Sequence, residues 1–240
     1  GNLARLGLTA LLSIVLVGES VSAIPKNAAV EVAQQGAIDN KEAIRKQALK
    51  LITEGRQLSK QGNAESLKQA ISKCEQAVEL LQQLGELKSS QAVLLYSIGS
   101  SYSNLGDKQQ ALKYYNQALS LAREIKDKSA EASILNNIAA IHDHLGDKQQ
   151  ALKVYNQALL LAREVEDKGA EATTLNNIGG IHNQLGDKQQ ALNYYNQALT
   201  IIRQIKGDKR WEAGSHNNIG QIYDTLGDKQ QELEYYNKAL

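Results

Sequence analysis

The chain has 240 residues, of which 42% are hydrophobic, and a formal net charge of +1 at pH 7. This composition is ordinary for a folded protein and excludes a disordered one. The near-neutral charge gives no electrostatic reason to expect a nucleic acid or an anionic membrane as partner. The single cysteine, Cys74, excludes an internal disulfide and a cysteine-based metal cluster, and we expect it to be a buried apolar residue.

Residues 1–23 have the pattern of a secretory signal peptide. Arg5 precedes a short apolar run over residues 6–17, and small residues precede the cleavage expected after Ala23. The run is shorter than the about 20 apolar residues that span a bilayer. We therefore expect export to the periplasm or the extracellular space, with no stable membrane insertion after cleavage. The alternatives are an uncleaved membrane anchor and an N-terminal packing helix.

Residues 24–38 are weakly patterned, and the sequence predicts a linker there. Asp39 and Glu42 fit a capping box that starts the first helix. Residues 39–88 then keep the spacing of a first, divergent helical hairpin, with a longer turn before Ala70 than in later units.

The hexapeptide Leu-Gly-Asp-Lys-Gln-Gln occurs four times in the rest of the chain. The copies begin at Leu105, Leu145, Leu185 and Leu226, so their spacings are 40, 40 and 41 residues. Such a fixed period indicates a stacked repeat architecture. The repeats define four units, residues 89–128, 129–168, 169–209 and 210–240, and the second helix of the last unit is truncated.

Each unit has the pattern of two helices joined by Gly-Asp. In the unit 129–168, Leu135 and Ile138 share one helix face. Gly146 suits the left-handed end of that helix, while Asp147 suits the start of the next helix, with Gln150 completing a capping box. Because the link has only two residues, the helices must be antiparallel neighbours. The sequence therefore predicts an all-α solenoid of antiparallel helix hairpins.

The alternation of large and small residues in these helices resembles the tetratricopeptide repeat (TPR). It is carried by Leu135, Ala139, Ala151, Tyr155 and Ala158 and by the equivalent residues of the other units. The period exceeds the family's common about 34 residues, so the units resemble the long repeats of kinesin light chains. The resemblance implies a right-handed superhelix in which the first helix of each pair lines a concave surface. The repeated hexapeptide also resembles cyanobacterial TPR proteins, many of which carry a caspase-like CHAT domain after the array.

Asparagine pairs recur on the expected concave face in three successive units. A side-chain amide offers both a donor and an acceptor, so it can pair with the backbone of an extended peptide whatever the peptide's side chains are. We predict a non-catalytic scaffold, without cofactor or metal ion, that binds a peptide or helix of a partner protein in this groove. The predicted partner-binding residues are Asn136, Asn137, Asn176, Asn177, Asn183, Asn217, Asn218 and Gln221.

Charged residues on this face indicate the kind of partner. Lysine and arginine are almost absent from it, which disfavours a clamp for carboxylates or phosphates. Asp143 and Asp224 lie on the face instead, so we expect a neutral to mildly basic ligand. His142 and His182 share a column in successive units, too far apart to hold one metal ion, and are predicted to be packing residues. Trp211 is predicted to be a local plug.

Three alternatives remain open from the sequence. The repeated polar face could be the harmless result of duplication. The chain could be the regulatory arm of a larger enzyme, a CHAT caspase-like peptidase, which a His and Cys pair downstream in the open reading frame would identify. The array could also associate end to end through the apolar face of its last helix.

Overall fold

The computed structural model describes residues 26–85, 87–205 and 209–239, with no description of the side chains of residues 26–33. It divides into two units, residues 1–43 and 44–240. The predicted signal peptide, residues 1–23, lies outside the described residues. None of the described helices is both long enough and apolar enough to cross a membrane.

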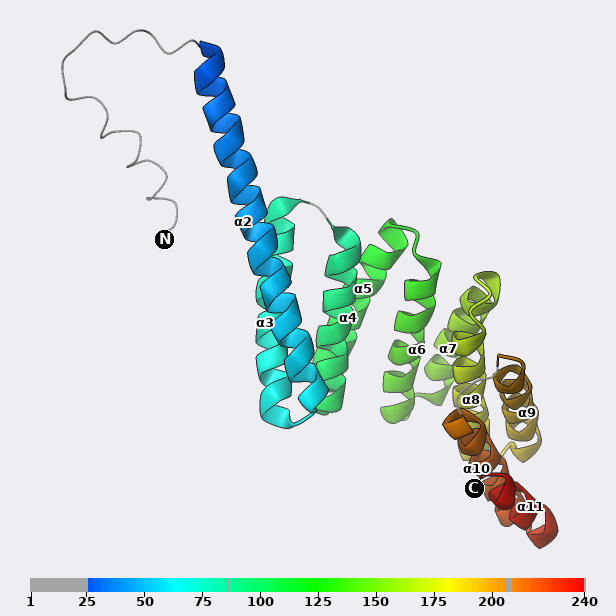
Figure 1. Cartoon of the computed structure of the whole chain (residues 1–240). Helices are drawn as coiled ribbons and strands as arrows, with labels where there is room; N and C mark the ends of the chain where they lie inside the picture. Colours follow the sequence, from blue (N-terminus) through cyan, green and yellow to red (C-terminus); the bar gives the residue numbers. More distant parts are fainter. Residues whose placement is uncertain (1–25, 86, 206–208, 240) are drawn as a thin grey trace, which may run out of the picture. The chain divides into compact units, whose positions relative to one another are not determined.

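The described ranges contain ten helices and no strand, which confirms the predicted all-α solenoid of helix hairpins. In the unit 44–240, successive hairpins lie side by side in chain order, from α2 and α3 to α10 and α11 (Figure 1). The bounds are α2 Lys26–Gln61, α3 Ala64–Leu84, α4 Lys88–Asn104, α5 Lys108–Glu124, α6 Lys128–His144, α7 Lys148–Glu164, α8 Lys168–Gln184, α9 Lys188–Gln204, α10 Lys209–Leu226 and α11 Lys229–Ala239.

The first helix starts earlier than the sequence predicts. α2 begins at Lys26, so residues 26–38, predicted to form a linker, are helical. Asp39 lies inside this helix, where its carboxylate accepts a hydrogen bond from Gln35 Nε2 at 2.8 Å. The predicted helix start at Asp39 is therefore wrong. The physical reason is that the preceding segment is rich in alanine and glutamine, which favour the helix.

The turn of the first hairpin is shorter than predicted and consists of Gly62 and Asn63. Gly62 has a φ of 71°, and the Asn63 side chain accepts a hydrogen bond from Ser66 N at 2.8 Å. The extra residues before Ala70 lie in the first turns of α3 rather than in the loop. A three-residue insertion is nearly one helical turn, so the helix absorbs it with little change of register.

The repeated hexapeptide builds the turn inside each later hairpin. Gly146 has a φ of 85°, a left-handed conformation that glycine adopts without strain. The Asp147 N–H donates to His142 O at 3.0 Å, and the Asp147 carboxylate caps α7 by accepting from Gln150 N at 3.0 Å. The predicted capping box would have the Gln150 side chain accept a hydrogen bond from the Asp147 N–H. In the structure the Asp147 N–H donates to His142 O instead.

The lysine of the hexapeptide belongs to the same turn. Lys108, Lys148 and Lys188 donate to backbone carbonyl oxygens five residues earlier, at 3.0, 3.2 and 3.2 Å. These carbonyls lie at the end of the first helix in these hairpins, where each also accepts a hydrogen bond from the glycine N–H of the turn. A cation at the C-terminal end of a helix is favourable. Glycine, aspartate and lysine therefore close the turn together.

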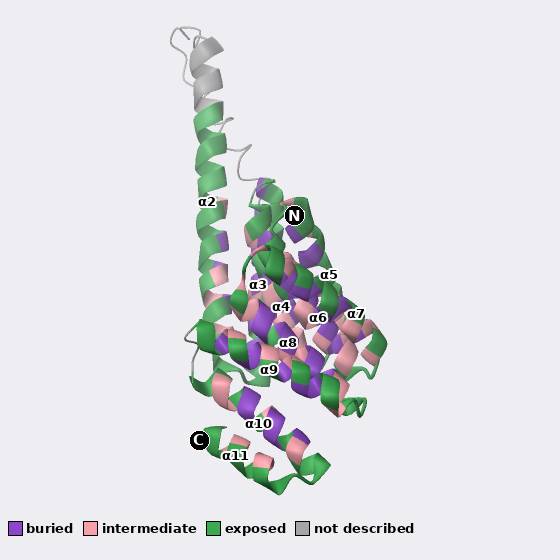
Figure 2. Cartoon of the chain, turned by 90° about the vertical axis from the view of Figure 1, so that its right-hand side faces the viewer, coloured by how far each residue is buried: buried purple, intermediate pink, exposed green. Residues whose placement is uncertain are grey.

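Small residues allow the two helices of a hairpin to lie close together. A Cβ built at Gly179 would lie 2.9 Å from the Cδ1 and Cε1 atoms of the Tyr195 ring. In the first hairpin, a Cβ at Gly55 would lie 2.9 Å from Cys74 Sγ. Cys74 is buried, as predicted, and burial, together with the nearby Glu75 carboxylate, raises the pKa of its thiol to about 11. Figure 2 shows the buried residues gathered where the helices face one another.

Ion pairs join the second, third and fourth hairpins each to the hairpin that follows. Arg163 Nε in α7 lies 2.7 Å from Glu171 Oε1 in α8, and Lys168 Nζ lies 2.8 Å from Glu171 Oε2. Burial alone would raise the pKa of the Glu171 carboxyl, but hydrogen bonds from Lys168 and Arg163 outweigh it and hold the pKa below its ordinary value. The same contact recurs as Arg123 with Glu131 and as Arg203 with Glu212.

The last described hairpin has a less buried second helix. α11 contains no buried residue, and its Leu233 is 62% exposed, whereas the equivalent Leu192 in α9 is 8% exposed. Leu192 belongs to an apolar cluster with Ile219 and Ile222 of the following helix. A leucine at the position of Leu192 and Leu233 is therefore buried by the helix of the next unit rather than by its own hairpin.

Candidate functional site

Two hollows lie between neighbouring first helices of the hairpins. The first, which we name the amide hollow, lies between α8 and α10 and has a volume of about 240 Å³. It is defined by Thr173, Asn176, Asn177, Trp211, Gly214 and Asn218. The second, which we name the serine hollow, lies between α2 and α4 and has a volume of about 550 Å³. It is defined by Leu49, Ile52, Arg56, Val93, Tyr96 and Ser97.

Three of the eight predicted partner-binding residues, Asn176, Asn177 and Asn218, meet in the amide hollow. Asn136 and Asn137 lie on α6, Asn217 and Gln221 on α10, and Asn183 near the end of α8. The structure therefore brings three of the predicted residues together in one hollow, and the other five lie outside it.

The first asparagine of two of the three pairs, Asn136 and Asn176, forms hydrogen bonds between hairpins. Asn136 Oδ1 accepts from Thr174 Oγ1 at 3.2 Å and from Asn177 Nδ2 at 3.3 Å. One unit later, Asn176 Nδ2 donates to Ser215 Oγ at 3.3 Å. These bonds hold neighbouring first helices in register, so part of the hydrogen-bonding capacity of this column is used within the array.

The second asparagine of each pair keeps more free capacity. Asn137 Nδ2 donates to Tyr96 OH at 2.7 Å, and Asn177 Nδ2 donates to Asn136, but neither amide oxygen is engaged in these two bonds. Within the part of the chain that the structure describes, the Asn218 side chain has no hydrogen-bond partner. Since an amide offers two donors and two acceptors, all three side chains can bond to a ligand. All three are half-buried.

Asn183 and Gln221 have different surroundings. Lys188 Nζ lies 2.5 Å from Asn183 Oδ1, so the lysine of the hairpin turn occupies this amide oxygen. Gln221 is exposed on α10, one residue after Gly220. Asn183 thus serves the turn, and Gln221 is available at the surface of the same helix as Asn218.

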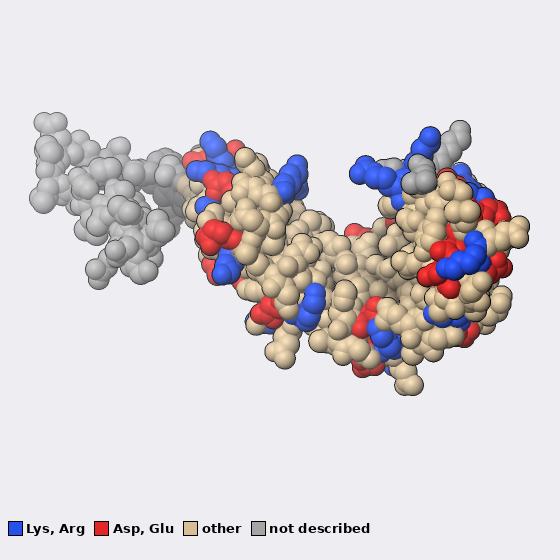
Figure 3. All heavy atoms as spheres, turned by 90° about the horizontal axis from the view of Figure 1, so that it is seen from below, with Lys and Arg blue, Asp and Glu red and all other residues tan. Residues whose placement is uncertain are grey.

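The two acidic residues of the predicted face are paired with lysines. Lys148 contacts the Asp143 carboxylate, and Lys229 Nζ lies 2.6 Å from Asp224 Oδ1. The hydrogen bonds to Asp224 and then to Glu232 raise the pKa of Lys229. In the view of Figure 3, blue and red side chains lie next to each other in small clusters separated by uncharged surface. Each of the two carboxylates of the predicted face is therefore compensated by a lysine of its own hairpin.

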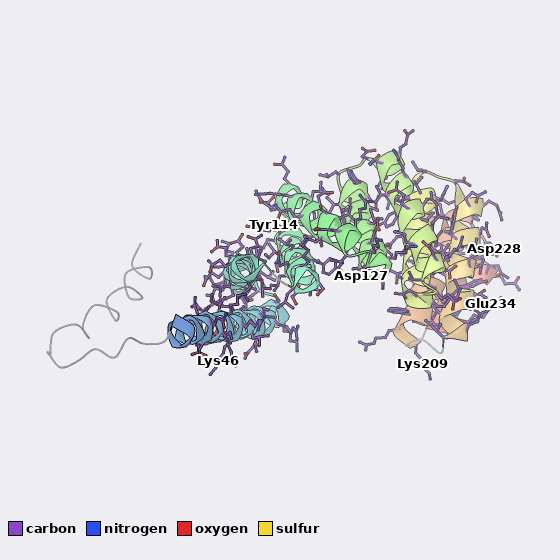
Figure 4. All side chains as sticks on the ribbon, turned by 90° about the horizontal axis from the view of Figure 1, so that it is seen from above. Lys46, Tyr114, Asp127, Lys209, Asp228 and Glu234 are labelled. Atoms are coloured by element: carbon purple, nitrogen blue, oxygen red, sulfur yellow. The ribbon has the colours of Figure 1, made fainter. Side chains whose placement is uncertain are left out.

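Aromatic rings pair inside the hairpins, and one of these pairs, Tyr96 with Tyr115, includes a residue that lines the serine hollow. The rings of Tyr102 and Tyr114 stack with centroids 5.4 Å apart, and Tyr114, labelled in Figure 4, donates its hydroxyl to Glu75 Oε1 at 2.5 Å. Burial first, and then this hydrogen bond, raises the pKa of Tyr114. His182 stacks on Tyr194 in the same way, with centroids 5.3 Å apart, so it packs as predicted.

Two features of the site were missed by reasoning from the sequence. Trp211, predicted to be a plug, is 46% exposed and forms a wall of the amide hollow, with its ring near Gly169. The serine hollow was not predicted at all. Its signal was nevertheless present, because Leu49 and Val93 are apolar at positions where later units carry Ser133, Thr173 and Gly214.

The chain matches a model of a known protein family over most of its length. The model is described as Tetratricopeptide repeat, and it matches residues 60–124, 130–204 and 171–240. No curated protein matches the chain.

Solved structures share the fold at low sequence identity. A putative kinesin light chain from Podosopora anserina is 13% identical with a TM-score of 0.63, covering 80% of this chain and 94% of that chain. A Rap protein complexed with competence and sporulation factor is 20% identical with a TM-score of 0.66, covering 79% and 52%. The quorum sensor NprR from B. thuringiensis is 21% identical with a TM-score of 0.70, covering 88% and 58%. This chain spans about half the length of the last two proteins.

Proposed function

This chain belongs to the tetratricopeptide repeat family, and on that premise we propose that it is a non-catalytic scaffold that binds a peptide or helix of a partner protein. The ligand would lie along the first helices of the hairpins, across α6, α8 and α10. The observation that carries the proposal is the column Asn137, Asn177 and Asn218, three half-buried amides with unused hydrogen-bonding capacity.

The chemistry of these amides suits a peptide backbone. The amide oxygens of the column can accept from a ligand N–H, and the amide nitrogens of Asn177 and Asn218 can also donate to a ligand C=O, as neighbouring strands do for each other. The amide nitrogen of Asn137 already donates to Tyr96 and to the Ser133 carbonyl, so this residue offers its oxygen. Because Asp143 and Asp224 are paired with lysines of their own hairpins, the ligand needs little charge here. We therefore propose that the segment bound to this part is neutral to mildly basic.

Proteins of similar fold are consistent with this proposal. The solved Rap protein is in complex with competence and sporulation factor, and NprR is described as a quorum sensor. At 20% and 21% identity these likenesses establish the fold only, so their ligands are not carried over to this chain.

The proposal predicts that changing Asn137, Asn177 and Asn218 together to alanine weakens ligand binding by about a hundredfold, because three hydrogen bonds of about 1 kcal/mol each are lost. The ligands are obtained by selecting, from a displayed library of random dodecapeptides, the peptides that bind the folded chain. Their affinities for the chain and its variants are measured by fluorescence polarisation. Helicity stays unchanged, and the melting temperature falls by a few degrees because the bonds to Tyr96 and Asn136 also disappear.

A matched control is available on the second helices. Asn116, Asn156 and Asn196 recur with the same period on α5, α7 and α9 and are exposed. Changing these three to alanine removes the same number of amides and leaves affinity within about twofold of the parent chain. Equal affinity of the two triple variants for the selected peptides contradicts the proposal.

End-to-end self-association is a second proposal, favoured by the exposure of Leu233 in a column that is otherwise packed against the next unit. Multi-angle light scattering then gives a mass that rises with protein concentration. Changing Leu233 to glutamine abolishes the rise, because it places a polar group on the contact. A mass that rises equally in the variant shows that this face is not the contact.

A further inference from the structure

The side of the array that is lined by the first helices changes chemistry along its length. The column that contains Asn137, Asn177 and Asn218 begins with Thr53 in α2 and Ser97 in α4. The neighbouring column reads Ile52 and Tyr96 in the first two hairpins and asparagine in the next three. A ligand that lies along several hairpins therefore meets apolar side chains at one end and amides at the other.

The apolar end is the serine hollow. Leu49 of α2 and Val93 of α4 line it and are 64% and 57% exposed, which is unusual for large apolar side chains in a folded protein. Buried Leu67 and Leu94 also contribute to the lining. With a volume of about 550 Å³, the hollow can receive one or two bulky side chains.

The charged lining of the serine hollow is entirely positive. Arg56 is the only charged residue among its lining residues, and no carboxylate lines it. Within the described ranges, the Arg56 guanidinium has no hydrogen-bond or ion-pair partner. The nearest acid in the sequence, Glu54, is already paired with Lys73, whose Nζ lies 2.7 Å from Glu54 Oε2. An arginine beside an apolar surface binds a carboxylate in preference to a neutral or cationic group.

Serine hydroxyls line the same hollow as this cation, and two of them, those of Ser97 and Ser101, donate to backbone carbonyls of α4. Six serines line the hollow, and Ser59 follows Arg56 by three residues on α2, so the two lie on the same face of that helix. Serine hydroxyls can donate to the second oxygen of a carboxylate held by Arg56. The lining thus offers an apolar surface, one cation and several small donors.

We propose that the serine hollow is the anchor subsite of the ligand groove and binds a partner peptide that presents a bulky aliphatic or aromatic side chain within two residues of an aspartate or glutamate. The apolar side chain contacts Leu49, Ile52 and Val93, and the carboxylate pairs with Arg56. This inference rests on the proposed function, because it places the acidic, apolar end of the same peptide at α2 and α4 and its neutral part on the amides.

A peptide fits better than a fatty acid, which also joins an apolar group to a carboxylate. Tyr96 of the hollow accepts a hydrogen bond from Asn137 of α6, so the amide column continues directly from the serine hollow. Amides match the N–H and C=O groups of a backbone, and an acyl chain would leave them unpaired. We therefore expect a peptide in the hollow, and the experiment must distinguish peptide binding from fatty-acid binding.

The experiment uses the same dodecapeptide selection. The affinities of the enriched peptides are then measured for the full chain and its variants. We expect a consensus with a bulky apolar residue next to or two residues from an acid. Arg56→Gln and Val93→Asn each weaken the enriched peptides by about tenfold or more. Lys60→Gln, an exposed cation on the same helix outside the lining, and Leu185→Asn, an exposed leucine at the end of α8, change affinity by less than about twofold.

A charge exchange sharpens the test. Arg56→Glu loses the enriched peptides, and a synthetic peptide with its acid changed to lysine regains affinity for that variant alone. Circular dichroism on every variant checks that the exposed substitutions leave the helices intact. The inference is overturned by failure to enrich any peptide, by a consensus without an acid, or by affinity that Arg56→Gln leaves unchanged. It is also overturned if decanoate binds more tightly than the peptides with the same dependence on Arg56.

The outcomes separate this inference from the proposed function. Peptides that depend on Asn137, Asn177 and Asn218 but not on Arg56 or Val93 support the groove and overturn the anchor subsite. Peptides that depend on Arg56 and Val93 but not on the amides support the subsite and overturn the amide column.

Discussion

Changing Tyr195 to alanine lowers the free energy of unfolding by about 3–5 kcal/mol, the range for deleting a large buried aromatic side chain. Tyr195 is buried in α9, and its ring lies directly over Gly179 of α8, which has no side chain to fill the space left behind. Burial also raises the pKa of the Tyr195 hydroxyl to about 12. The measurement is urea unfolding followed by circular dichroism.

The neighbouring tyrosine supplies the control for this prediction. Tyr194 is half-buried and stacks on His182 instead of lying over a glycine. Changing Tyr194 to alanine therefore costs about 1 kcal/mol, the order of one aromatic pair. Two variants of equal stability are the result that contradicts the packing described here.

The second large effect is expected at His216, where leucine stabilises the last hairpin by about 1–3 kcal/mol near neutral pH. His216 is 2% exposed, and Arg203 Nη2 lies 3.2 Å from its Nε2. Since arginine can only donate, Nε2 accepts and the proton sits on Nδ1, which is buried without a partner among the described residues. The equivalent residues in the other units are Leu95, Leu135 and Leu175.

The same substitution removes a dependence on pH. Burial and the Arg203 charge lower the pKa of His216 below its ordinary 6.5, although Glu212 opposes the shift; Lys238 lowers it further. Below pH 6.5 the unfolded chain binds a proton that the folded chain does not, so stability falls as the pH falls towards the lowered folded value. Below the pKa of His216 in the folded chain, this contribution to stability is completely lost.

Urea unfolding at pH 7.5, 6.5 and 5.5 checks this prediction. The parent chain loses stability across this window, and His216→Leu loses less. Glu212 does not confuse the result: hydrogen bonding to Arg203 lowers the pKa of its carboxyl below 4.5, so its contribution is lost only under more acidic conditions. Identical pH profiles of the parent and His216→Leu show that the imidazole is not responsible.

Most of the hairpin architecture follows from the sequence because its determinants are local. Gly146, Asp147 and Lys148 make the contacts that close the turn within five residues of themselves, so the hexapeptide specifies the turn wherever it occurs. Lys148 makes one further contact, with Gln184 of the next hairpin. The first hairpin was harder to predict because its turn uses Asn63 in place of aspartate and its extra residues lengthen α3. The start of α2 was missed because helix propensity continues past an apparent capping residue, Asp39.

The candidate site was predicted only in part, because its chemistry depends on neighbours about 40 residues away. Two asparagines in adjacent positions, Asn136 and Asn137, look equivalent in the sequence. The structure separates them, since Asn136 accepts from Thr174 and Asn177 of the next hairpin while Asn137 donates to Tyr96 of the previous one. Which amide oxygen remains available is a property of the register between helices.

The sequence by itself determined the repeat period, the helix pairs and their closed turns, because hydrophobic periodicity and helix capping act over a few residues. The tertiary structure alone decided which amides are used between hairpins, where the two hollows lie, and that Arg56 faces an apolar surface without a carboxylate. The reason is physical: side chains far apart in the chain meet only once the hairpins have packed, and packing sets distances that no local pattern contains.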